Sequence, residues 1–134
     1  MAKAKLTKQL AVETSNKIGM FVEVTGAIAD AGANIISICA YGDNNKALFY
    51  LIASNNKKAK IALLKKGFKV TEKEVITIAL KDKVGQAKEI AEKIKEAGIS
   101  LDYVYGTTCG CKDKGALIVI GTKDKNKLVS VLNS

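Results

Sequence analysis

The sequence NKIGMFVEVTGAIADAGANI at residues 16–35 returns at residues 82–101 as DKVGQAKEIAEKIKEAGISL. When the two are aligned without a gap, Gly19 falls on Gly85 and Gly32 on Gly98. Two unrelated amphipathic helices rarely share a glycine at both ends and a lysine before the first one. The chain therefore contains an internal repeat.

Apolar residues recur at helical spacing between the glycines of each copy, which predicts an amphipathic helix in each. In the first copy these positions are Ile18, Phe21, Val24, Thr25, Ile28 and Ala31, and in the second Val84, Ala87, Ile90, Ala91, Ile94 and Ala97. The glycines that follow, Gly32 and Gly98, are typical of a helix that ends in a left-handed turn.

Strands and further helices surround these two helices. Runs rich in Val, Ile, Leu and Thr predict strands at residues 9–15, 34–41, 47–54, 74–81, 100–107 and 116–122, with a short candidate strand at 68–70. Lysine-rich segments at residues 57–66 and 124–132 predict two further helices. Turns rich in Gly, Asp and Asn separate the strands at residues 42–46 and 110–115.

The order of elements is βαββαβ followed by βαββα. It predicts an α+β fold of two tandem ferredoxin-like modules, residues 1–73 and 74–134, each an antiparallel sheet with its helices on one face. The second module lacks its last strand, so its sheet has one strand fewer or borrows one. The connector at residues 71–75 is short, and we expect the two modules to pack as one rigid body.

The charge of the chain is strongly positive without pointing to nucleic acid. The net charge is +9, and every basic residue is Lys, since the chain has no Arg and no His. Arg is the residue that forks onto phosphates and guanine edges, so its absence weighs against specific nucleic-acid recognition. No apolar run approaches the roughly 18 residues that span a bilayer. We therefore expect a cytoplasmic protein with a solvated lysine surface and no membrane partner.

The residues that usually carry catalysis or bind metals are scarce. The absence of His removes the commonest general base and zinc ligand. The three cysteines, Cys39, Cys109 and Cys111, are too few for a structural zinc site, which needs about four ligands. Tyr103, Tyr105, Cys109 and Cys111 form the one cluster worth testing for catalysis. The sequence predicts no enzyme activity, no metal and no cofactor.

These motifs resemble the ACT domain family over about residues 8–132. That family has a first strand ending in Asp or Asn, a turn with Gly, a helix, and a Gly followed by Asn-Ile at the second strand. The first copy has NKIG at residues 16–19 and AGANI at 31–35, and the second has DKVG at 82–85 and AGISL at 97–101. Where the family often places Pro before the first Gly, this chain has Ile18 and Val84.

The resemblance implies a regulatory protein. ACT modules bind amino acids where two modules meet, through the loop before the first helix and the start of the second strand. The tandem pair is then an allosteric sensor or regulator of amino-acid metabolism. With no enzyme domain in the chain, it is expected to act on a partner enzyme and to form a homodimer or higher oligomer.

The resemblance implies one ligand site in each copy. The residues are Asn16, Ile18, Gly19, Asn34 and Ile35 in the first copy, and Asp82, Val84, Gly85, Ser100 and Leu101 in the second. Free N–H groups at the start of the helix favour a carboxylate, and Asn16 suits an α-ammonium. Because the charge of Asp82 repels a carboxylate, we expect the first copy to bind better.

Three alternatives stay open. Asn16 and Asp82 are also the residue types that cap helices. A sensor of the PII type would bind a nucleotide through a basic loop, for which residues 107–114 offer two lysines. A protein–protein interaction module would bind no small ligand.

Overall fold

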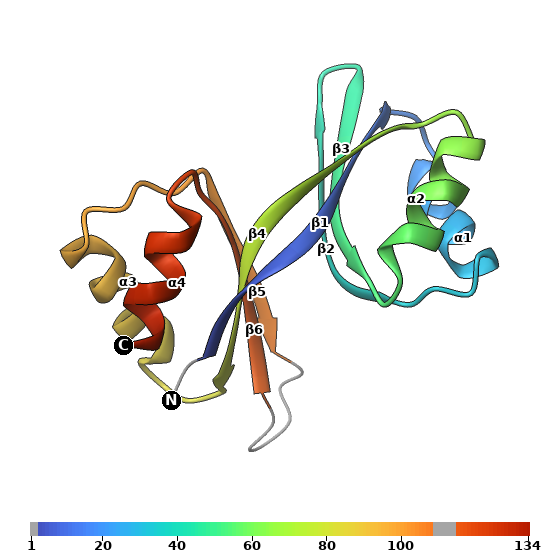
Figure 1. The fold of residues 1–134 in the computed structure, drawn as a ribbon. Helices are drawn as coiled ribbons and strands as arrows, with labels where there is room; N and C mark the ends of the chain where they lie inside the picture. Colours follow the sequence, from blue (N-terminus) through green and yellow to red (C-terminus); the bar gives the residue numbers. More distant parts are fainter. Residues whose placement is uncertain (1–2, 109–114) are drawn as a thin grey trace. The chain divides into compact units, whose positions relative to one another are not determined.

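The computed structural model describes residues 3–108 and 115–134 of the chain (Figure 1). Its elements are β1 (Lys3–Ser15), α1 (Met20–Asp30), β2 (Ile35–Asp43), β3 (Lys46–Ala53), α2 (Asn56–Lys65), β4 (Lys69–Lys81), α3 (Gln86–Glu96), β5 (Tyr103–Thr108), β6 (Gly115–Gly121) and α4 (Lys125–Asn133). The chain forms two compact units, which we call the first module (residues 8–73) and the second module (residues 3–7 and 74–134).

The first module is a four-stranded sheet in the order β2-β3-β1-β4. Both β1 and β2 pair antiparallel with β3, so that Leu10 and Ile38 are each in register with Leu51. Helices α1 and α2 lie on the same face of these strands (Figure 1). This arrangement confirms the predicted ferredoxin-like module.

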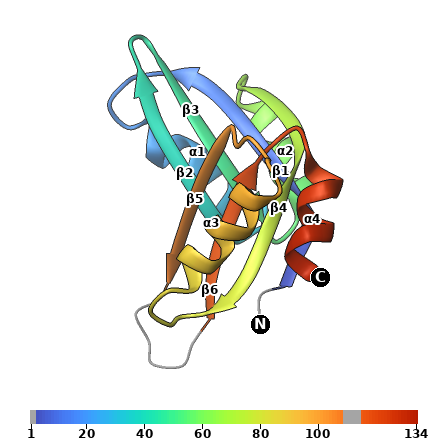
Figure 2. The same ribbon diagram turned by 90° about the vertical axis from the view of Figure 1, so that its left-hand side faces the viewer.

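The second module repeats the arrangement in the order β1-β4-β6-β5. Strand β6 pairs antiparallel with β4 and with β5, which places Ile76 and Val104 opposite Ile120. Helices α3 and α4 lie together on one face of their strands (Figure 2). The second predicted module is therefore also confirmed.

The missing last strand of the second module is borrowed from the start of the chain. Residues 3–7 of β1 belong to this module, where Ala4 is buried in its core. The N–H of Ala4 donates to Asn133 Oδ1 at 2.9 Å, and Asn133 Nδ2 donates to the carbonyl of Ala4 at 2.8 Å. The hydroxyls of Thr7 and Thr77 are 2.6 Å apart. The structure thus divides the chain differently from the predicted ranges at its N-terminal end.

The predicted connector between the modules is part of a strand. Residues 71–75 lie inside β4, whose first residues belong to the first module and whose later residues belong to the second. The two strands predicted at 68–70 and 74–81 are therefore one. A connector was expected at residues 71–75, but β4 runs through these residues without a break.

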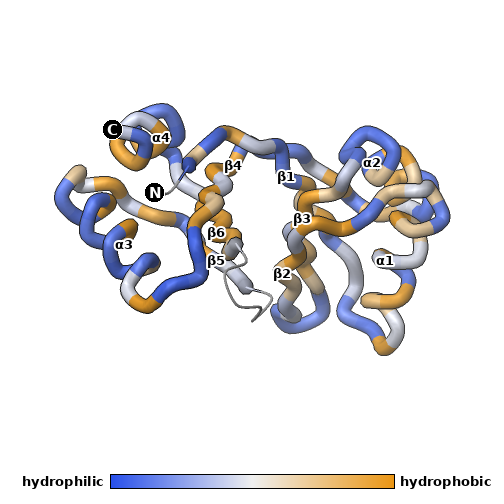
Figure 3. The backbone as a smooth tube through the Cα atoms, turned by 90° about the horizontal axis from the view of Figure 1, so that it is seen from below, coloured by the Kyte–Doolittle hydropathy of each residue, from blue (hydrophilic) through white to orange (hydrophobic). Residues whose placement is uncertain are grey.

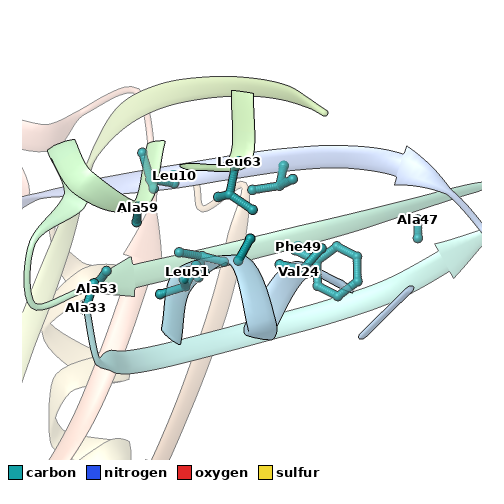
Figure 4. Close-up of a cluster of buried hydrophobic side chains, with 12 residues drawn as sticks. Leu10, Val24, Ala33, Ala47, Phe49, Leu51, Ala53, Ala59 and Leu63 are labelled. Carbon is teal, nitrogen blue, oxygen red and sulfur yellow. The ribbon is translucent and has the colours of Figure 1, made fainter. Parts of the chain in front are cut away.

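Each module has its own apolar core between its sheet and its helices. In the first, Val24 of α1 and Leu63 of α2 are directed toward Leu10, Phe49 and Leu51 of the strands (Figure 4). Hydropathy varies along the helices, as expected when one side packs on a sheet (Figure 3). The core of the second module contains Ala4, Ile76, Ile78, Leu80, Ile90, Ile94, Ile99, Ile120, Leu128 and Leu132.

The two long helices begin later than their apolar pattern predicts. Ile18 and Val84 were expected on the helical apolar face, but they precede the helices and are fully exposed, at 107% and 106%. The backbone of Gly19 and Gly85 has φ values of 90° and 88°, outside the helical range. Each helix therefore starts only after its glycine. The predicted left-handed turns at the helix ends are present, in Gly32 and Gly98.

A small charge cluster spans three strands of the first module. Glu13 of β1 lies 3.0 Å from the Nζ of Lys46 on β3 and 3.6 Å from that of Lys69 on β4. The hydrogen bond and positive charge of Lys46, with a smaller contribution from Lys69, lower the pKa of Glu13. The stabilisation is present above the pKa of the unfolded chain and is lost as the pH falls through the folded pKa.

Replacing the nearer lysine tests this cluster. We expect Lys46→Met to raise the pKa of Glu13 toward its ordinary value, and Lys69→Met to raise it less, because Lys46 makes the shorter contact. An NMR titration of the Glu13 carboxyl carbon measures both. Because both lysines are largely exposed, we expect little change in the melting temperature. An unchanged pKa in Lys46→Met would show that the ion pair does not persist in solution.

Candidate functional site

A pocket of about 440 Å³ lies in the first module where β1 passes into α1. The loop and first turn of α1 contribute Asn16, Lys17, Gly19, Met20 and Phe21. The end of β2 contributes Ala40, Tyr41 and Gly42, and the start of β3 contributes Ala47 and Phe49. Its volume lies in the range of about 300–1,000 Å³ that small-molecule sites occupy.

The turn at Gly19 shapes the polar end of this pocket. Gly19 is the N-cap of α1 in a left-handed conformation, and no side chain caps the helix there. The first helical hydrogen bond runs from the N–H of Glu23 to the carbonyl of Gly19. Within residues 3–108 and 115–134, the N–H groups of Phe21 and Val22 have no backbone acceptor. These donors and the helix dipole favour an anion at this end.

Asn16 joins the loop to the β2–β3 hairpin. Its backbone N–H donates to the carbonyl of Asn45 at 2.8 Å, and its Nδ2 donates to that of Asn44 at 3.3 Å. Gly42 leaves room for this amide, because a Cβ there would lie 2.6 Å from Asn16 Nδ2. Asn16 thus anchors the hairpin and does not cap α1. Its Oδ1 accepts no hydrogen bond from the described residues.

The predicted site residues of the first copy do not all meet in this pocket. Asn16 and Gly19 line it, whereas Ile18 precedes the helix with its side chain exposed. Asn34 and Ile35 follow the other end of α1, whose 11 residues span about 16 Å. The backbone of Asn34 exchanges hydrogen bonds with Ser54, at 2.8 Å and 2.7 Å, and Ile35 packs against the core.

The second copy places its predicted residues in the same way. Gly85 again precedes the helix in a left-handed conformation, with Val84 exposed beside it. Asp82 does not cap the helix but accepts a hydrogen bond from the hydroxyl of Thr108 at 2.8 Å.

Ser100 and Leu101 lie beyond the C-terminal end of α3. The carbonyl of Ser100 accepts from Thr122 Oγ1 at 2.7 Å, while Leu101 packs against the core. As in the first copy, the two predicted halves of the site are at opposite ends of a helix.

Sequence reasoning missed the walls that β2 and β3 contribute. Tyr41, Gly42 and Phe49 line the pocket only because the hairpin returns beside the loop of Asn16. The turn at residues 42–46 was recognised, but nothing in its sequence shows which loop it approaches. The glycine at position 42 was the one available signal. Its missing side chain leaves the space that the Asn16 amide occupies.

The described residues show no metal centre. No group of three or more His, Cys, Asp or Glu side chains gathers within residues 3–108 and 115–134. Tyr103 and Tyr105 stack with ring centroids 6.4 Å apart. Cys109, Cys111 and most of the loop at residues 107–114 lie outside the described residues, so the predictions for them stay predictions. In the part of the chain that is described, no helix is long and apolar enough to cross a membrane.

Comparison with known proteins decides the family. The family model described as an ACT domain pair matches residues 5–134. The chain belongs to the ACT domain family. The match begins at Lys5, so it includes part of the strand that the second module borrows.

Solved structures share the fold of this chain. A Bacteroides thetaiotaomicron protein is 25% identical, with a TM-score of 0.86 over 97% of this chain and 88% of its own. The ligand-free regulatory subunit of aspartate kinase from Thermus thermophilus shares the fold at 10% identity, with a TM-score of 0.69 over 97% of this ACT pair and 94% of its own chain. The regulatory subunit of aspartate kinase from Thermus flavus is 12% identical, with a TM-score of 0.63 over 98% of this chain and 95% of its own. Among curated proteins, none matches this sequence.

Proposed function

We propose that this ACT pair is a non-catalytic regulator that binds an amino acid in the pocket at the start of α1. The observation that supports this most strongly is that Phe21, whose helix N–H has no backbone acceptor among the described residues, lines the same cavity as the Asn16 side chain. The N–H groups and Lys17 suit the α-carboxylate. The Oδ1 of Asn16 suits the α-ammonium.

The remaining walls favour an amino acid with an apolar side chain. Met20, Phe21, Tyr41 and Phe49 surround the rest of the pocket, and none of the described residues that line it is acidic. A basic side chain such as that of lysine would find no counter-charge there. We therefore propose a branched or aromatic amino acid as the ligand.

The first module is the better candidate of the two. The corresponding position in the second module is Asp82, whose charge repels a carboxylate. The family resemblance places such ligands where two modules meet. We propose that a second copy of the chain covers the open side of the pocket, and that its Asn34 and Ile35 supply the predicted residues that this module does not bring there itself.

Calorimetry with the twenty amino acids tests the proposal. We expect an apolar amino acid to bind, and Gly42→Ala to weaken its binding at least tenfold, because the added methyl displaces the Asn16 amide. Asn16→Ala should have a similar effect. Stability of the ligand-free protein should change little in Gly42→Ala, since the displaced group is the end of a flexible side chain. Light scattering of the same samples gives the particle mass.

Gly26→Ala is the matched control. Gly26 lies in α1, and a Cβ there meets no atom within 4 Å. It should leave binding unchanged and stabilise the helix by up to about 1 kcal/mol. If the wild-type chain binds none of the twenty amino acids, the proposal is wrong and a protein–protein interaction module takes its place. If Gly42→Ala binds as tightly as wild type, the site lies elsewhere.

A further inference from the structure

A second cavity, which we call the helix groove, lies between α1 and α2 of the first module. Its volume is about 550 Å³. Its lining includes Ala27 of α1 and Ala31, the C-cap residue of that helix, together with Lys58, Ile61 and Ala62 of α2. The three alanines are small, which leaves room between the helices. The groove shares no lining residue with the amino-acid pocket.

The floor of the groove is apolar and open to solvent. Ile61 is 47% exposed although it is a large apolar residue on a helix whose core contacts are made by Ala59 and Leu63. Leu64, three residues further along α2, is similarly exposed. Exposed apolar side chains next to a recess mark surfaces that other molecules contact.

The rim of the groove is cationic. Three lysines line it, Lys58, Lys65 and Lys66, and Asp30 is the one acidic residue among the described residues of its lining. Residues 56–66 hold five lysines and no acidic residue. No ion pair within residues 3–108 and 115–134 involves the rim lysines or Asp30. The positive charge of the rim is therefore not compensated by the described part of the chain.

The second module provides an internal comparison. Its helix α4 aligns with α2 through the core residues Leu128 and Leu132, which match Ala59 and Leu63. This alignment places polar Ser130 at the position of Ile61. The repeat likewise places Lys93 at the position of Ala27.

A cavity of about 190 Å³ between α3 and α4 is not the counterpart of the groove, since of its lining residues only Lys93 and Ser134 align with residues that line the groove. The sequence comparison is therefore the informative one: Lys93 and Ser130 replace the apolar Ala27 and Ile61. The apolar floor belongs to the first module, and the repeat does not require it.

We propose that the helix groove docks an acidic segment of a partner protein. Apolar side chains of that segment, at helical spacing, would contact Ile61 on the floor of the groove. Its carboxylates between them would pair with Lys58 and Lys65. A second copy of this chain is a poorer occupant of the groove than an acidic segment, because at this rim its net charge of +9 meets the positive charge of Lys58, Lys65 and Lys66. A membrane fits less well than a segment, since the apolar surface is recessed and Asp30 lies beside it.

NMR of the labelled full chain tests the proposal with two synthetic peptides. One has leucines at i, i+3, i+4 and i+7 with glutamates elsewhere, and the other replaces every glutamate by lysine. We expect the glutamate peptide to shift the amides around Ile61 and Ala27, and the lysine peptide to bind at least tenfold more weakly. We expect the double variant Lys58→Glu with Lys65→Glu to bind the glutamate peptide at least tenfold more weakly than the wild-type chain does.

The matched control is Lys125→Glu with Lys127→Glu on α4, which should change the affinity less than twofold. In the groove variant, Lys58→Glu lies near the start of α2 and Lys65→Glu at its end, so their effects on the helix dipole oppose each other. The proposal is overturned if no groove amide shifts up to about 1 mM peptide. Equal binding of both peptides overturns it as well. The proposal is also overturned if the chain binds vesicles of anionic lipid and binds neither peptide.

Discussion

Removing residues 1–7 is expected to unfold the second module while the first keeps its structure. The deletion eliminates the borrowed strand, and with it the paired hydrogen bonds of Ala4 with Asn133 and the contact of Thr7 with Thr77. Each such bond contributes about 1 kcal/mol, and the strand pairing with β4 is lost in addition. We expect the free energy of unfolding of this module to fall by at least about 3 kcal/mol.

This loss is large for a unit of this size. A module of fewer than about 70 residues buries a smaller share of its surface than an ordinary domain and is marginally stable alone. Hydrogen exchange resolves the outcome by segment: protection of β6 and α3 should collapse, and that of β3 and α1 should persist. The exposed lysines of the same strand provide a control, because Lys3→Ser with Lys5→Ser keeps the backbone pairing.

Asn133→Ala gives an intermediate case. It removes only the two bonds to Ala4, so we expect a loss of about 2 kcal/mol without a change of fold. Unchanged exchange in β6 after the deletion would mean that residues 3–7 do not belong to the second module.

Ile28→Ala and Ile94→Ala should each lower the free energy of unfolding by about 2–5 kcal/mol. The two residues occupy equivalent places in the repeat, and both are buried between a helix and its sheet. Truncation removes apolar contacts and leaves a cavity that the surrounding core closes only in part. Urea unfolding measures both losses, and hydrogen exchange shows which module opens.

Val22→Ala on α1 is the control for these two variants. Val22 lies in the same helix as Ile28 but is largely exposed, so we expect a change within about 0.5 kcal/mol. A loss below about 1 kcal/mol in both isoleucine variants would contradict the equivalence of the two cores.

The sequence predicted the secondary structure well because its signals are local. Helical spacing of Val24 and Ile28, and glycines at the ends of α1 and α3, act within a few residues of each other. The repeat doubled this evidence, since both copies gave the same order of elements. The start of each helix was wrong by two residues, because apolar spacing continues through Gly19 although the backbone turns there.

The pocket could be predicted only in part, because sequence signals are local and some of its walls come from distant parts of the chain. Asn16 and Gly19 stand out because they belong to a recurring motif at the start of a helix. Tyr41, Gly42 and Phe49 carry no motif, and they reach the site through the pairing of β2 with β3. Asn34 resembled a site residue in the motif, yet the length of α1 separates it from Asn16 within one module.

By itself, the sequence determined that this protein is two copies of one βαββ unit, because repetition and periodicity are properties of the chain alone. Only the tertiary structure decided how the second copy completes its sheet. Residues 3–7 resemble any polar N-terminal segment, and they become a strand because β4 offers them an unpaired edge. Pairing between residues so far apart depends on the whole fold, which no local pattern records.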